Sequence, residues 1–118
     1  MGSHQIVDVS HVEARNGIFR ALTDQLGVAG FRINQLELAP GAEGLEHDHT
    51  ESDQEEVYAV VAGDGVLRAG GEEIPVRAGD FVHLPPDVRR QMVAGDQGLT
   101  WIGIGSAVAG EKPRAWCR

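Results

Sequence analysis

Cysteine is nearly absent from this chain, because Cys117 is the only one among 118 residues. A single thiol cannot form an intramolecular disulfide, so we expect a reducing, cytoplasmic setting. Long apolar runs are also missing, since no stretch approaches the roughly 20 residues that cross a bilayer, and the start of the chain lacks a signal-peptide pattern. We therefore expect no membrane partner.

Positive charge is scarce as well. Ten lysines and arginines stand against 18 acidic residues, which gives a formal net charge of −8. Nucleic acids are polyanions, so a chain with this charge is not expected to bind them. Aromatic residues make up only 5% of the chain, whereas glycine supplies 16 residues, and this combination predicts many short strands joined by tight turns.

The chain also lacks helical periodicity over any window of about 11 residues, while short apolar runs alternate with turn signals. This pattern predicts one all-β domain, an antiparallel sandwich or barrel, over residues 6–106. Residues 1–5 are expected to be a tag remnant, and residues 107–118 an irregular tail. Expected strands include residues 6–9, 31–38 with a β-bulge near Asn34, 45–49, 57–61 and 81–84. Tight hairpin turns are expected at residues 63–65 and 95–98.

Two histidines stand out within this pattern. His47 and His49 are two residues apart in an extended stretch, so both imidazoles should point to the same side. Glu56 opens the next apolar run and can bring a carboxylate to the same place. Two imidazoles and a carboxylate form a set that suits iron and neighbouring divalent metals.

The spacing around this pair resembles that of the cupin family. Gly41, five residues, His47-x-His49, then Glu56, six residues and Gly63 are similar to the first cupin motif. Gly79-Asp80, four residues and Pro85-Pro86-Asp87 are similar to the second. The resemblance covers roughly residues 33–105 and implies a double-stranded β-helix, or jelly roll, closed around a pocket. It also implies a small-molecule ligand or substrate and a homodimer.

The resemblance further implies a metal set of His47, His49 and Glu56, binding iron, nickel, manganese or zinc, and no organic cofactor. Two departures accompany it. Six residues separate His49 from Glu56, which is more than the family usually has, and Arg90 occupies the position of the third histidine. A guanidinium stays protonated and cannot ligate a metal.

Arg90 therefore has three interpretations. It can bind a substrate carboxylate or phosphate, neutralise Glu56 in a buried ion pair, or point to solvent after a change of register. His83 is a candidate replacement ligand, or else a structural or exposed residue, because its strand parity relative to the pocket is not fixed by sequence.

Other candidate residues would line the pocket. Tyr58 shares parity with Glu56 and is a candidate catalytic acid or an ordinary core aromatic. Met92, Phe31 and Trp101 are candidates for apolar substrate contacts. Three functions remain open. The first is a metal-dependent enzyme of the dioxygenase, isomerase or cyclase type. The second is a metal-free epimerase or cyclase in which His47 or His49 is the base and Arg90 anchors an anion, and the third is a non-catalytic binding module.

Overall fold

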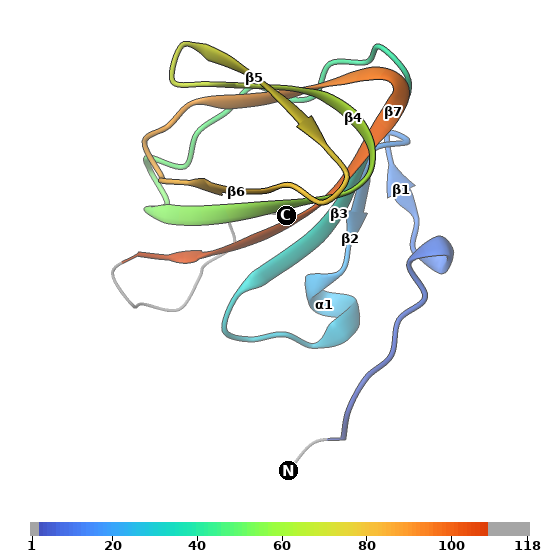
Figure 1. The fold of residues 1–118 in the computed structure, drawn as a ribbon. Helices are drawn as coiled ribbons and strands as arrows, with labels where there is room; N and C mark the ends of the chain where they lie inside the picture. The colour runs from blue at the N-terminus through green and yellow to red at the C-terminus, as the bar shows by residue number, and fades with distance from the viewer. Residues whose placement is uncertain (1–2, 109–118) are drawn as a thin grey trace.

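The computed structural model describes residues 3–108 of the chain (Figure 1). A 3-10 turn at Val9–His11 and a one-turn helix α1 (Thr23–Leu26) accompany seven strands. The strands are β1 (Ala14–Arg15), β2 (Phe19–Ala21), β3 (Arg32–Leu38), β4 (Gln54–Ala69), β5 (Glu72–Arg77), β6 (Phe81–Leu84) and β7 (Arg90–Ala107).

All pairings between these strands are antiparallel, in the order β1-β2-β3-β7-β4-β5, and β6 pairs with β4. Strands β4 and β7 form the longest ladder, which runs from Gln54 opposite Ala107 to Ala69 opposite Arg90. Both strands curve strongly, so the sheet closes on itself around a buried interior (Figure 1). The all-β jelly-roll prediction is confirmed.

The interior is filled by side chains that alternate with outward ones along the strands. Leucines dominate its centre, and Leu67, Leu84 and Leu99 are at most 2% exposed. The predicted strand at residues 81–84 is confirmed as β6, in which Val82 and Leu84 face inward and Phe81 and His83 face outward. None of the described helices is long and apolar enough to span a membrane.

The expected hairpins at residues 63–65 and 95–98 are wrong. At both places the chain continues as one strand, and the β4–β7 ladder changes register between Gly63 and Gly65. The glycines do not reverse the chain but allow two backbones to approach closely. A Cβ on Gly63 would overlap the backbone oxygen of Gly98. Long bent strands replace the two hairpins.

Three further strand predictions need correction. Strand β3 pairs with β7 in unbroken register from Arg32 to Leu38, so the bulge near Asn34 is absent. The apparent slip in the pattern arises because polar Asn34, only 5% exposed, takes an inward position. Residues 45–49 are extended but join the sheet only through an isolated bridge at His47, and residues 6–9 lead into the 3-10 turn instead of forming a strand. Most of the expected C-terminal tail lies outside the described residues.

Candidate metal and ligand-binding site

Backbone hydrogen bonds place the two histidines at the edge of the barrel. The His47 amide donates to the Arg90 carbonyl at 3.0 Å, the Arg90 amide donates back at 2.8 Å, and the His49 amide donates to the Pro86 carbonyl at 2.9 Å. The extended segment so held turns both imidazoles to one side, with ring centroids 5.0 Å apart. The predicted convergence of His47 and His49 is therefore present.

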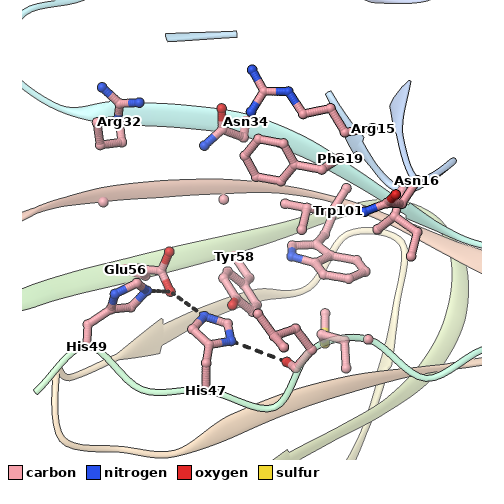
Figure 2. Close-up of a pocket in the computed structure, with 17 residues that line it drawn as sticks. Arg15, Asn16, Phe19, Arg32, Asn34, His47, His49, Glu56, Tyr58 and Trp101 are labelled. Carbon is pink, nitrogen blue, oxygen red and sulfur yellow. Dashed lines mark hydrogen bonds and ion pairs between the residues drawn. The ribbon is translucent and has the colours of Figure 1, made fainter. Parts of the chain in front are cut away.

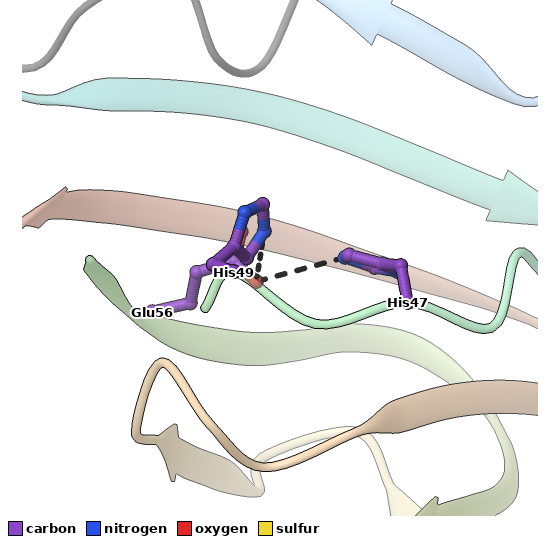
Figure 3. Close-up of side chains that lie close together, drawn as sticks. All are labelled: His47, His49 and Glu56. Carbon is purple, nitrogen blue, oxygen red and sulfur yellow. Dashed lines mark ion pairs between the residues drawn. The ribbon is translucent and has the colours of Figure 1, made fainter. Parts of the chain in front are cut away.

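Glu56 reaches the same point from β4. Its Oε1 lies 3.3 Å from His49 Nε2 and 4.0 Å from His47 Nε2 (Figure 3). The long loop before it does not displace the carboxylate, because the chain turns back at Asp53, whose amide donates to the His49 carbonyl at 2.9 Å. Asp53 has a φ of 53°, which lets the turn absorb the additional residues.

These three side chains fit a divalent metal. One ligand atom from each lies within 4.8 Å of the others. Two donors bound at about 2.1 Å to a common ion are separated by about 3.0–3.4 Å when they are adjacent in the coordination sphere. The 3.3 Å between His49 Nε2 and Glu56 Oε1 lies in this range, whereas the 4.0 Å from His47 Nε2 exceeds it, so an ion would draw His47 closer. Glu56 Oε1 is buried and accepts no hydrogen bond from the described residues, although the Arg90 guanidinium lies 3.4 Å from it.

The tautomer and charge of the His47 ring also suit metal binding. Its Nδ1 lies 3.2 Å from the Leu45 carbonyl, which can only accept, so Nδ1 carries the proton and Nε2 offers its lone pair toward Glu56. Burial lowers the pKa of His47 below its usual value, which keeps the ring neutral. On the other ring, His49 Nδ1 lies 3.4 Å from Ser52 Oγ.

Arg90 points inward and is 1% exposed. Its Nη2 lies 3.4 Å from Glu56 Oε1, and its guanidinium also donates to the carbonyls of Val88, at 2.6 Å, and Leu84, at 3.3 Å. Arg90 thus lies behind Glu56 and away from the cavity surface. Of the three interpretations, the geometry matches the buried ion pair with Glu56.

A cavity of about 430 Å³ opens in front of this group (Figure 2). The candidate residues Tyr58, Met92 and Trp101 line it, and the Tyr58 and Trp101 rings lie 5.8 Å apart. Phe31 does not line it, because it precedes β3 and is 41% exposed. His83 is also elsewhere: it lies on the outer face of β6, where its Nε2 is 2.8 Å from Glu55 Oε1.

Several lining residues were missed by the sequence reasoning. Arg15, Asn16 and Phe19 come from the β1–β2 hairpin, and Arg32 and Asn34 from β3. Asn16 and Gly17 both have positive φ, and the Ile18 amide donates to the Arg15 carbonyl at 3.0 Å, which is a type I′ turn. The Asn-Gly dipeptide at 16–17 is a strong signal for that hairpin, whereas no local pattern marks the inward parity of Arg32.

Comparisons with known proteins agree with this architecture. The cupin domain family model matches residues 34–105. A cupin protein from Bacteroides fragilis has a TM-score of 0.79 and 25% identity, covering 98% of this chain and 93% of that one. A cupin 2 conserved barrel domain protein from Salinispora arenicola has a TM-score of 0.72 and 25% identity, with 93% and 92% coverage.

A third similar structure is described as a sugar phosphate isomerase of the cupin superfamily, from Silicibacter pomeroyi. It has a TM-score of 0.67 and 29% identity, covering 76% of this chain and 59% of that protein. A search of curated proteins found none that matches this sequence.

Proposed function

Because this chain belongs to the cupin family, we propose that its barrel binds a small organic molecule and converts it with a divalent metal held by His47, His49 and Glu56. One observation carries the proposal: three suitable donor atoms converge on the wall of a cavity of small-molecule size. When bound, the metal would supply Lewis-acid or oxygen-binding chemistry.

The chain's own groups would bind and orient the substrate. Trp101 and Met92 form apolar wall, and Tyr58, on the same inward face of β4 as Glu56, is proposed as the proton donor or acceptor. Isomerase chemistry has some support from the structure described as a sugar phosphate isomerase, which is 29% identical to this chain.

Metal binding is the decisive test. Tag-free, chelator-treated protein is incubated in turn with iron, nickel, manganese and zinc, dialysed, and analysed by mass spectrometry for metal per chain. We expect about one ion per chain, and His49→Ala should abolish it. His83→Ala is the matched control, because that histidine lies on the outer face and should leave the stoichiometry unchanged. Substoichiometric loading with all four metals would refute the metal site.

A metal-free enzyme is the second candidate, supported by the lowered pKa of His47, which provides a neutral imidazole at the cavity wall. It predicts turnover in the presence of chelator, abolished by His47→Gln. A non-catalytic binding module predicts ligand binding without turnover in a metabolite screen. In neither the metal-free enzyme nor the binding module would Arg90 anchor the ligand, because it lies behind Glu56.

We also propose a homodimer. Apolar side chains continue across the outer face of the sheet, where Val57 is opposite Ile104, and Ala59 is opposite Ile102 and Phe81. Phe81 is 76% exposed, and such faces are usually covered by a partner. Light scattering should give the mass of two chains, and Phe81→Glu should shift it toward one.

A further inference from the structure

The inward side chains of the sheet change from apolar to ligating in successive rows along the cavity wall. In one row, Phe19 on β2 is paired with Leu36 on β3, and Leu36 is paired with Trp101 on β7. All three line the cavity, and we call them the apolar row. Aromatic residues are scarce, yet three of the six in the chain, Phe19, Tyr58 and Trp101, line this cavity. Walls of this kind favour ligands with an apolar body.

The proposed metal group, which consists of His47, His49 and Glu56, lies at the other end of the same wall. Gly105, four residues beyond Trp101 on β7, is paired with Glu56. Four residues of a strand cover about 13 Å, so there is room for a small molecule between the apolar row and the metal group. Figure 2 shows His49 and Glu56 on one side of the cavity and Trp101 on the other.

The extended segment on the facing wall follows the same order. Leu45, His47 and His49 are each two residues apart, so they share one side of the segment, and all three line the cavity. His49 Nε2 lies 3.3 Å from Glu56 Oε1, His47 Nε2 lies 4.0 Å from it, and Leu45 follows two residues further away. Both walls therefore become apolar with distance from Glu56.

A glycine keeps the space between the two ends open. Gly103 is paired with Asn34 on one side and with Tyr58 on the other. Its φ is not positive, and a Cβ at this position would make only ordinary contacts with Tyr58 and Leu36, at 3.6 Å or more. Neither backbone conformation nor packing requires a glycine here, so its effect is to leave room in the middle of the cavity.

Two hydrogen-bond donors belong to this part of the wall. The Asn34 side-chain oxygen accepts from the Leu22 amide at 3.2 Å, which leaves the Asn34 NH₂ group on the cavity side (Figure 2). Trp101 is 3% exposed, and its indole N–H has no hydrogen-bond acceptor among residues 3–108. A buried donor without an acceptor costs free energy, and an oxygen atom on a ligand would remove that cost.

We propose that the substrate is a small, mainly apolar carbonyl compound with one ring. The ring packs against the apolar row, the carbonyl oxygen accepts from Trp101 and Asn34, and the remaining end reaches the metal group. A sugar is outside this class, because its hydroxyl groups would lie against apolar side chains without partners. As the substrate class of the proposed function, this ligand rests on that function for the identity of the cavity as the reaction site.

The test uses neutral probes titrated into chelator-treated, ¹⁵N-labelled protein and followed by nuclear magnetic resonance. Acetophenone has the ring and the carbonyl group, acetone has the carbonyl group alone, and methyl glucoside represents sugars. We expect acetophenone to bind at least about tenfold more tightly than acetone, because the ring buries apolar area. Equal affinity for acetophenone and acetone, or tighter binding of methyl glucoside, would overturn the proposal.

The carbonyl contact has a signal of its own. Ethylbenzene has nearly the shape of acetophenone but no oxygen, so the two rings should shift nearby resonances alike. Acetophenone should in addition move the Trp101 indole proton downfield, as a new hydrogen bond does. The chain has two tryptophans, and Trp101→Phe assigns the signal because it removes one of the two. Identical indole shifts with acetophenone and ethylbenzene would refute the contact.

Two variants locate the ring. Phe19→Ala removes part of the apolar row and should weaken acetophenone about tenfold. Phe31→Ala is the matched control, because Phe31 is 41% exposed and does not line the cavity. Equal losses in both variants would contradict the placement. Gly103→Val fills the middle of the cavity and should abolish binding of acetophenone and ethylbenzene alike, and retained affinity would also contradict it.

Failure of the substrate class is distinguishable from failure of the proposed function, because the probes are titrated without metal. A protein that loads one ion per chain but prefers methyl glucoside has the metal site and refutes the apolar carbonyl ligand. A protein that binds acetophenone as expected but loads none of the four metals supports the ligand class and refutes the metal site.

Discussion

The guanidinium of Arg90 and the carboxylate of Glu56 meet at 3.4 Å, on the same oxygen that lies 3.3 Å from His49 Nε2. The pair brings a cation into contact with the carboxylate of the proposed metal group. It neutralises Glu56 and fixes its orientation, but it also leaves a divalent ion with less negative charge to bind.

The first prediction concerns this buried pair. Arg90→Met leaves the Glu56 charge buried without a partner, so the free energy of unfolding should fall by about 3–5 kcal/mol. Arg90→Met combined with Glu56→Leu should recover much of that loss, because it removes both charges. Urea unfolding at neutral pH of Arg90→Met, Glu56→Leu and the double variant measures the coupling, and simple additivity of the two substitutions would contradict the pairing.

The second prediction concerns metal affinity. Arg90→His removes the positive charge and offers a third imidazole, so affinity for zinc or nickel should rise by at least about tenfold. Competition with a chromophoric chelator measures the change. Arg89→His is the matched control, because Arg89 is exposed and pairs with Glu46 at 3.1 Å. A similar gain in both variants would show that the added histidine acts from the surface.

The third prediction separates two glycines of similar φ. Gly63 has a φ of 78° and Gly71 a φ of 82°, but only Gly63 faces a neighbouring backbone. Gly63→Ala should cost at least about 3 kcal/mol, because strain and steric overlap add. Gly71→Ala should cost only the strain, about 1–2 kcal/mol. Thermal unfolding of both variants checks the difference, and equal losses would mean that the close approach is relieved cheaply.

The fourth prediction concerns pH. Glu37 Oε2 accepts from Arg20 Nε at 2.7 Å, and this hydrogen bond lowers the pKa of Glu37. The stabilisation is therefore complete above the unfolded-state pKa of about 4.3 and is lost as the pH falls through the lower folded-state pKa. Because both side chains are partly exposed, we expect about 1 kcal/mol.

Glu37→Gln should accordingly destabilise the protein near neutral pH and have little effect near pH 2. Glu72→Gln, at an exposed position on β5, controls for the loss of one negative charge. Unfolding curves recorded across this pH range provide the comparison. A constant difference between Glu37→Gln and the parent protein at all pH values would contradict the linkage.

The sequence allowed the fold class and the His47, His49 and Glu56 group to be predicted, because strand parity and motif spacing are local properties. It misled where one residue type serves two purposes. Gly63 and Gly98 look like turn residues, yet they permit backbones distant in sequence to touch. Asn34 looks like a break in the pattern, yet its inward side chain is held by Leu22. Such roles depend on the tertiary partner, which a local pattern does not contain.

Strands β4 and β7 each extend around the bend of the barrel, and this continuity affects how the protein unfolds. The same two strands supply Glu56, Tyr58, Met92 and Trp101 to the cavity, and Leu67 and Ala94 to the core away from it. The cavity wall and the core therefore belong to one cooperative unit. Native-state hydrogen exchange should find the slowest amides of β4 and β7 exchanging together, through global unfolding, on both sides of the bend.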